Sequence, residues 1–243
     1  MIAKGVAGWA AHGAPTTGAK ALDFEAFLAA LLVIPVVEIS RVQDAVPLAH
    51  ALIDAGLPCA EVTFRTIAAA PAIEAIAGSC PEILVGAGTV LNVAQAEAAL
   101  AAGARFIVAP GFDPAVAEFA LEHDVPIVPG VCTPTEVGMA LARGLSLVKL
   151  FPAEAAGGVD YLKALAAPFG GVRFVPTGGI GPDNLAAYLA VEQVVACGGS
   201  WMVKKDLIAA GAFDAVRALA AQARAIACAA RPTISHDPGG ERR

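Results

Sequence analysis

Charged residues are scarce in this chain, at 16% of 243 residues, and aromatic residues make up only 6%. The scarcity of charge does not indicate disorder, because disordered segments are poor in apolar residues and this chain is 57% hydrophobic. A membrane-spanning helix is excluded as well, since no stretch of about 20 residues lacks charge. The longest uncharged run, Gly5–Ala19, lacks the leucine-rich centre of a secretory signal. We therefore expect a soluble protein with a heavily buried core.

Histidines and cysteines are too few and too scattered to predict a metal centre. The four histidines show no HxH or HxxxH spacing, and the five cysteines contain no CxxC pair. An odd number of cysteines in a chain of this length predicts buried thiols in a reducing cytoplasm rather than a disulfide framework. We therefore expect a cytoplasmic protein with neither a metal nor a cofactor.

Basic residues are also few. The formal net charge is −6, and the 16 lysines and arginines are scattered, with their densest clusters at Lys204-Lys205 and Arg242-Arg243. A nucleic-acid-binding surface needs a concentrated basic face, which this pattern does not provide. We therefore expect no nucleic-acid partner, and the lack of an uncharged stretch of spanning length predicts no membrane partner.

Short apolar runs alternate with alanine-rich helical stretches along most of the chain. The eight runs are 33–39, 59–64, 83–87, 106–110, 126–130, 147–151, 172–176 and 193–197. Strands that are apolar throughout are covered on both faces, which indicates a parallel sheet. Eight strand–helix units predict an α/β fold, a single-domain (β/α)8 TIM barrel, with a helix at Phe24–Leu32 closing its bottom. An open doubly wound sheet is the alternative, although no GxGxxG follows Ile39.

The two ends of the chain differ in composition from its middle. They are rich in Gly, Pro, Ala or charge, and few apolar runs interrupt them. We expect a flexible N-terminal tail at 1–21, the barrel domain at 22–228 and a flexible C-terminal tail at 229–243.

Lys149 is the polar residue most out of place. It is one of six lysines, and it lies inside the apolar run Leu147–Phe151. An ammonium group loses hydration in such surroundings, which favours the neutral amine, and a neutral amine can form a Schiff base. The alternative is a lysine whose stem covers the apolar wall while its head reaches water.

The second strand carries a polar trio. Glu61, Thr63 and Arg65 share one face because strand side chains alternate, while Val62 and Phe64 take the other. At the mouth of a barrel, a carboxylate can transfer protons and a guanidinium can hold a substrate carboxylate. A structural ion pair between Glu61 and Arg65 is the alternative.

Glycine-rich turns follow three other strands, at Gly86–Thr89, Pro176–Gly179 and Gly198–Ser200. Glycines let a ligand approach the backbone, and the loops after strands seven and eight are where such barrels usually hold a phosphate. The two turns after strands seven and eight therefore predict a phosphate site, whereas Gly86–Thr89 indicates only that a ligand can approach the backbone there. The alternative is tight loop geometry without a ligand.

Taken together, these motifs resemble a known family. Glu61–Thr66, Gly86–Thr89, Val148–Glu154, Pro176–Gly179 and Gly198–Trp201 are similar to the motifs of the 2-keto-3-deoxy-6-phosphogluconate (KDPG) / 4-hydroxy-2-oxoglutarate aldolases. The resemblance runs from about residue 30 to 208, in family order. It implies a metal-independent class I aldolase, and a homotrimer.

The resemblance also implies a role for each site residue. Lys149 would form the Schiff base and Glu61 would be the general acid and base. The other residues would hold the substrate carboxylate (Arg65, Thr89), line the substrate pocket (Pro110, Phe151, Thr177) and bind phosphate (Gly178, Gly179, Gly199, Ser200). One position departs from the pattern, because Glu38 stands where some relatives carry an arginine. Arg41 is then a candidate substitute in phosphate binding.

The implied reaction is reversible cleavage of KDPG to pyruvate and glyceraldehyde 3-phosphate. Three alternatives stay open. The main substrate could be 4-hydroxy-2-oxoglutarate, which yields pyruvate and glyoxylate. The protein could be another phosphate-binding barrel, such as a sugar-phosphate isomerase that needs no imine. It could also be a non-catalytic barrel that binds a small anion as a sensor.

Overall fold

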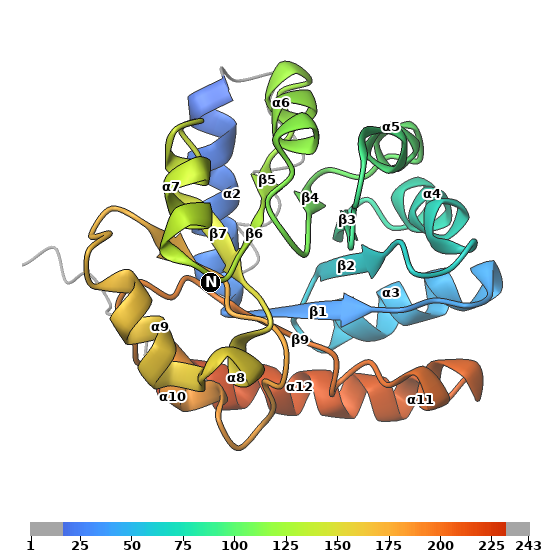
Figure 1. Cartoon of the computed structure of the whole chain (residues 1–243). Helices are drawn as coiled ribbons and strands as arrows, with labels where there is room; N and C mark the ends of the chain where they lie inside the picture. Colours follow the sequence, from blue (N-terminus) through green and yellow to red (C-terminus); the bar gives the residue numbers. More distant parts are fainter. Residues whose placement is uncertain (1–16, 232–243) are drawn as a thin grey trace, which may run out of the picture.

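A computed structural model of the chain describes residues 17–231 as one alternation of strands and helices (Figure 1). The strands are β1 (Val33–Val37), β2 (Cys59–Thr63), β3 (Leu84–Gly88), β4 (Ile107–Val108), β5 (Ile127–Val128), β6 (Gly130–Val131), β7 (Leu147–Leu150), β8 (Arg173–Phe174) and β9 (Cys197–Gly199). The helices are α2 (Thr17–Leu31), the short 3-10 helix η1 (Val42–Asp44), α3 (Ala45–Asp54), α4 (Ala69–Ser79), α5 (Val93–Ala101), α6 (Pro114–Glu122), α7 (Pro134–Leu141), α8 (Ala153–Ala156), α9 (Gly158–Ala166), α10 (Leu185–Leu189), α11 (Lys205–Ala209) and α12 (Phe213–Ala230).

All strand pairs are parallel, and the sheet is curled. Six strands follow the order β5-β4-β3-β2-β1-β9, and three more follow the order β6-β7-β8. Single bridges join Phe174 to Val194 and Thr177 to Gly198, so the residues after β8 lie beside β9. Strands that neighbour in sequence therefore also neighbour in space from β1 to β5, without the reversal of order that a doubly wound sheet shows. The prediction of an α/β fold with a parallel sheet is confirmed.

The predicted fifth strand is divided in two. β5 pairs with β4, whereas β6 pairs with β7. Pro129 stands between them and has no amide proton to donate, so it interrupts the ladder. The sheet is thus built in two sections instead of the single continuous ladder that the sequence predicts.

The strands are buried because their outer faces pack against the alanine-rich helices. Leu48 and Leu52 of α3 and Ile73 and Ile76 of α4 are fully buried in this layer. Each such side chain contributes about 1.5–3 kcal/mol by leaving water. The alanines let these helices lie close to the sheet, which fixes where each strand ends.

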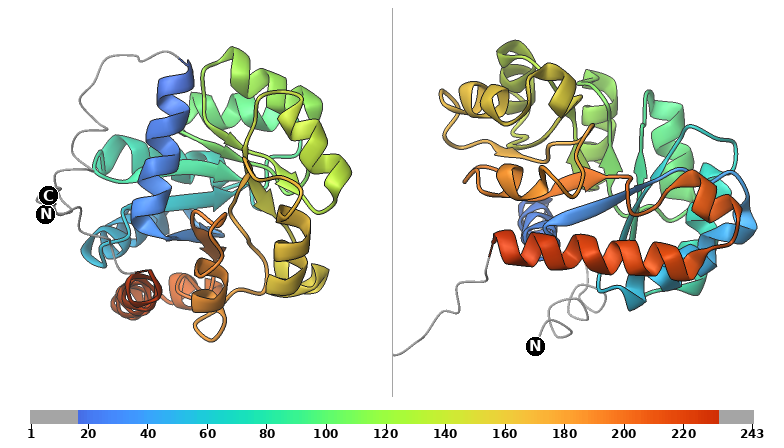
Figure 2. Two further views of the ribbon diagram at one scale, coloured as in Figure 1. Left: turned by 90° about the vertical axis from the view of Figure 1, so that its left-hand side faces the viewer. Right: turned by 90° about the horizontal axis from the view of Figure 1, so that it is seen from below.

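Helix α2 lies across the amino ends of the strands, as the left view of Figure 2 shows. The ring of Phe24 lies 5.1 Å from the ring of Phe106, which fills the space beside Gly86. Arg224 donates a hydrogen bond of 2.7 Å to the carbonyl of Leu31 at the end of the helix. The sequence predicted this closing helix, and its apolar contacts cover the amino ends of the strands.

Helices extend into both segments that the sequence predicts to be tails. Helix α2 begins at Thr17, before the expected domain boundary at residue 22, and α12 continues to Ala230. Residues 1–16 and 232–243, which make up most of the predicted tails, lie outside the described residues. None of the helices within residues 17–231 combines the length and apolarity needed to span a bilayer.

Candidate active site

Lys149 points into the interior of the curled sheet. Its neighbours Val148 and Leu150 are fully buried on the opposite face of β7, and the side chain of Lys149 is itself only 5% exposed. A lysine that reached water with its head would be far more exposed, so the snorkelling alternative is wrong. The amine is held within the protein, where its partners decide its chemistry.

The partner of Lys149 is Glu61. The Nζ atom of Lys149 lies 3.3 Å from Oε1 of Glu61, and the Glu61 side chain is only 3% exposed. Two buried charges are costly to remove from water, and such a pair is weak support for stability. Its position is better explained by chemistry, because a proton can pass directly between the amine and the carboxylate.

Two neighbours shape this pair. Gly88 on β3 leaves room for the Glu61 carboxylate, since a β-carbon at Gly88 would overlap it. The Lys149 Nζ atom lies 5.3 Å from the centroid of the Phe151 ring, within reach of a cation–π contact. The sequence predicted glycines at β3 as an approach for a ligand, but Gly86 and Gly88 make room for the side chains of Phe106 and Glu61.

The polar face of β2 continues toward the surface from Glu61. The hydroxyl of Thr63 donates a hydrogen bond of 2.9 Å to the carbonyl of Val37. Arg65 is half-exposed, and its Nη1 atom lies 3.9 Å from Oε2 of Glu38. The alternative of a Glu61–Arg65 ion pair is therefore wrong, because each residue has another partner.

An open cavity of about 480 Å³ lies at the carboxyl ends of β1, β2, β7 and β9. The predicted site residues that line it are Arg65, Phe151, Thr177, Gly178, Gly179, Gly199 and Ser200. Lys149 and Glu61 are buried and are not among the lining residues of the cavity. Phe151 follows Lys149 by two positions and Thr63 follows Glu61 by two, so each shares a strand face with its partner. Phe151 and Thr63 line the cavity, and the buried pair therefore lies behind them. The structure thus brings most of the predicted site together around one hollow, with the lysine–glutamate pair beneath it.

The glycines in the turns after β8 and β9 are required by their backbone conformation or by close neighbours. Gly178 and Gly179 have φ values of +100° and +79°, a region that residues with a side chain rarely adopt. A β-carbon at Gly179 would overlap Glu154, whose amide donates a 3.0 Å hydrogen bond to the carbonyl of Gly178. Gly199 similarly makes room for the ring of Trp201. The turns are therefore shaped by their neighbours and still present backbone to the cavity.

Thr89 and Pro110 lie at the ends of β3 and β4, outside the cavity lining. Thr89 has a φ of +55°, which is strained for a β-branched residue, and such strain often marks functional positions. Pro110 packs with its backbone against Gly130. Both residues therefore lie beside the strand ends, but neither lines the cavity.

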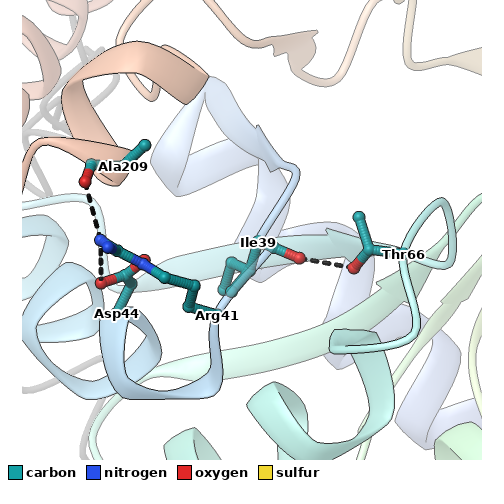
Figure 3. A network of polar contacts seen from close by, with 5 residues as sticks. All are labelled: Ile39, Arg41, Asp44, Thr66 and Ala209. Atoms are coloured by element: carbon teal, nitrogen blue, oxygen red, sulfur yellow. Dashed lines mark hydrogen bonds and ion pairs between the residues drawn. The ribbon is translucent and has the colours of Figure 1, made fainter.

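Arg41 does not take the place expected of it in phosphate binding. Figure 3 shows its guanidinium between the Asp44 carboxylate and the carbonyl of Ala209, with hydrogen bonds of 2.9 Å and 2.7 Å. The hydroxyl of Thr66 donates to the carbonyl of Ile39 in the same network. Arg41 is not among the lining residues of the cavity. Its hydrogen bond to Ala209 instead links α11 to the segment that follows β1.

Sequence reasoning did not assign three charged residues of the cavity to the site, although it noted Glu38 as a departure from the family pattern. Glu38, Lys204 and Lys205 line it, and Lys205 Nζ lies 2.6 Å from Oε1 of Glu38. Lys204 and Lys205 form a basic cluster that is too small for a nucleic-acid-binding face. Their place shortly after the eighth predicted strand could have marked them as site residues. Among residues 17–231, no three His, Cys, Asp or Glu side chains gather into a metal-binding group.

Comparison with protein families matches residues 24–219 of the chain to the model described as "KDPG and KHG aldolase". A relative in Treponema pallidum (strain Nichols), a 2-dehydro-3-deoxy-phosphogluconate aldolase, is 57% identical over 199 residues, which cover 82% of this chain and 94% of the relative.

Two solved structures are similar over most of their length. The KDPG aldolase of Legionella pneumophila, with pyruvate captured as a covalent carbinolamine, has a TM-score of 0.79 and 39% identity, covering 81% of this chain and 96% of that one. The 2-keto-3-deoxy-6-phosphogluconate aldolase of Zymomonas mobilis ZM4, with 3-phosphoglycerate, has a TM-score of 0.77 and 38% identity, covering 83% and 95%.

The site has a buried amine next to a carboxylate, beneath an open cavity at the carboxyl end of a parallel sheet. This geometry and the matches above indicate the same class of protein. The chain is an aldolase, a lyase that acts on carbon–carbon bonds. More narrowly, it belongs to the KDPG and KHG aldolase family.

Proposed function

We propose that this aldolase reversibly cleaves KDPG to pyruvate and glyceraldehyde 3-phosphate through an imine on Lys149. The buried contact between Lys149 and Glu61 beneath the cavity carries this proposal. The similar Legionella enzyme holds pyruvate as a carbinolamine, and the similar Zymomonas enzyme was solved with a phosphorylated three-carbon acid. Both support a substrate with a pyruvyl end and a phosphate end.

The first half of the mechanism builds the imine. Glu61 takes a proton from the Lys149 ammonium, and the neutral Nζ adds to the C2 carbonyl of the substrate to form a carbinolamine. Glu61 then returns a proton to the carbinolamine hydroxyl, which leaves as water. The product is a protonated imine that can accept an electron pair.

The second half breaks the carbon–carbon bond. Glu61 removes the proton of the C4 hydroxyl, directly or through a water molecule, and the C3–C4 electron pair moves into the imine. Glyceraldehyde 3-phosphate departs and an enamine of pyruvate remains. Protonation at C3 and hydrolysis of the imine release pyruvate and regenerate the Lys149 amine.

The remaining residues bind and orient the substrate in this proposal. Arg65 holds the pyruvyl carboxylate, and Phe151 and Thr177 surround the reacting carbons. Thr89 and Pro110 lie outside the cavity lining. For them we keep the roles that the family resemblance implies, Thr89 at the carboxylate and Pro110 beside the reacting carbons. The backbone at Gly178, Gly179 and Gly199 and the hydroxyl of Ser200 receive the phosphate. The placement of Arg65, Thr177 and the turns along one cavity supports these roles.

We further propose that the two sections of the sheet close into a complete eight-stranded barrel. Backbone hydrogen bonds of 2.9 Å from Val195 to Phe174 and from Gly198 to Pro176 support the closure. A homotrimeric, cytoplasmic enzyme with its barrel at 22–228 remains our expectation.

A second substrate, 4-hydroxy-2-oxoglutarate, is supported by the lining of the cavity. Lys204 and Lys205 can pair with any distal anion, including a carboxylate. Pyruvate release measured on both substrates separates the two, and we expect the larger kcat/KM on KDPG.

A coupled pyruvate-release assay on KDPG with EDTA present tests the proposal. We expect turnover in the unaltered enzyme and in Lys163→Gln, which removes an exposed lysine of α9. Lys149→Met should release no pyruvate. Full activity of Lys149→Met, or no pyruvate from either substrate with the unaltered enzyme, would refute the proposed reaction, and the latter would favour an anion sensor or an isomerase.

A further inference from the structure

One wall of the cavity concentrates positive charge. Arg65, Lys204 and Lys205 line it together with a single carboxylate, that of Glu38. The chain as a whole carries a formal net charge of −6, so this wall opposes the average charge of the protein. Clefts lined by one sign of charge attract ligands of the other sign. The wall therefore suits a ligand with more than one negative charge.

Glu38 lies between two of these cations. One of its oxygens is 2.6 Å from Nζ of Lys205, and the other is 3.9 Å from Nη1 of Arg65. The two ends of the Glu38–Lys205 pair differ in exposure, because the Glu38 side chain is 17% exposed and that of Lys205 is 68% exposed. The carboxylate is thus largely buried in the cavity wall, whereas the side chain of Lys205 is largely exposed.

The segment that carries Lys205 is held in place at its other end. Arg41 donates to the carbonyl of Ala209, the last residue of α11, as Figure 3 shows. The amide of Val203 donates a 3.1 Å hydrogen bond to the carbonyl of Ser200, so the lysines follow directly from the turn after β9. The backbone that carries Lys205 is therefore fixed at both ends of α11, and Lys205 lines the cavity together with Ser200 and Gly199.

We propose that Lys205 recognises the phosphate of the substrate and that Glu38 is its partner while the site is empty. This inference rests on the proposed function. An ion pair with a highly exposed lysine stabilises only weakly, so a phosphate with nearly two negative charges can replace the carboxylate. Glu38 then keeps its contact with Arg65. Lys205 would thereby distinguish a phosphorylated sugar acid from the same acid without phosphate.

Kinetics on a matched pair of substrates test the inference. KDPG and 2-keto-3-deoxygluconate differ only in the phosphate. We expect Lys205→Gln to raise KM for KDPG about tenfold and to leave KM for the unphosphorylated acid unchanged, because one charge-assisted contact is lost. Lys163→Gln is the control and should change neither value. An equal loss on both substrates, or no change on KDPG, would overturn the inference.

Binding of inorganic phosphate supplies a readout that needs no turnover. Calorimetric titration should give a dissociation constant about tenfold weaker for Lys205→Gln than for the unaltered protein and for Lys163→Gln. Equal constants would overturn the inference. If the unaltered enzyme cleaves neither substrate but Lys205→Gln weakens phosphate binding, the proposed reaction fails and the anion site stands.

Glu38→Gln tests the second half of the inference. Removing the competing carboxylate should lower KM for KDPG about two- to threefold, a small effect because the exposed pair is weak. A raised KM would refute Glu38 as a partner that phosphate replaces.

Discussion

The two ends of the sheet differ in the kind of side chain that covers them. At the amino ends, α2 covers the strands with apolar contacts such as that between Phe24 and Phe106. At the carboxyl ends, charged side chains surround an open cavity above the pair of Lys149 and Glu61. Apolar packing stabilises the fold, whereas a buried ion pair and strained turns do not. Stability and chemistry should therefore be separable by substitutions at the two ends.

The largest expected effect is on turnover. The double variant Lys149→Met with Glu61→Gln replaces the buried pair by neutral groups of similar size. We expect pyruvate release to fall by at least about 10⁴-fold, because both the proposed nucleophile and the proposed proton carrier are lost. The free energy of unfolding should stay equal or rise by about 1–4 kcal/mol, since the cost of burying two charges disappears.

Denaturant unfolding and the pyruvate assay measure both quantities. Lys163→Met with Glu122→Gln, two exposed residues on α9 and α6, is the matched control. If the free energy of unfolding of the double variant is several kcal/mol lower than that of the control, the pair stabilises the fold. The two ends of the sheet would then not differ in the way described above.

The largest effect on stability should come from the other end. Phe24→Ala leaves a cavity against Phe106 and should lower the free energy of unfolding by about 3–5 kcal/mol. The kcat of the folded enzyme should be unchanged, because Phe24 lies at the end opposite the site. Leu91→Ala, at a half-exposed position, is the control and should change stability by less than about 0.5 kcal/mol. A kcat that falls with Phe24→Ala would contradict the separation.

A turn at the carboxyl end should show a mixed effect. Gly179→Ala places a β-carbon at a φ of +79° and against Glu154, so stability should fall by about 1–3 kcal/mol. KM for KDPG should rise as well, because the turn lines the cavity. Gly181→Ala in the same loop has open space and is the control. A changed stability with an unchanged KM would exclude the turn from substrate binding.

The smallest expected effect is a pH dependence at the cap of α7. Burial tends to raise the pKa of Glu136, but hydrogen bonds from the amides of Cys132 and Thr133 and from the Thr133 hydroxyl outweigh it, so the pKa is lowered. A lowered folded-state pKa means that the carboxylate stabilises the fold above its unfolded pKa. That contribution is lost as the pH falls through the folded pKa.

Glu136→Gln should therefore cost about 1 kcal/mol at neutral pH and less as the pH falls. Unfolding curves recorded across acid and neutral pH measure the difference, with Glu122→Gln as the control. A cost for Glu136→Gln that grows in acid would reverse the sign and refute this assignment.

The sequence predicted those features that depend on local pattern. Apolar runs marked the strands, alternation placed Glu61 and Thr63 on the inner face, and an isolated lysine in an apolar run marked Lys149. Features that depend on distant neighbours were missed. The break at Pro129 requires knowing both adjacent strands, and the contact of Glu38 with Lys205 joins the end of the first strand to a residue far along the chain. The reason for Gly88 became clear only with Glu61 in place.

Reductive trapping tests the central claim most directly. The protein is incubated with pyruvate and borohydride, digested, and its peptides are weighed by mass spectrometry. The account predicts a reduced pyruvyl group on the peptide that contains Lys149, and none on that peptide in Lys149→Met. A pyruvyl group attached to a different lysine, or an unmodified Lys149 peptide from enzyme that cleaves KDPG, would contradict it.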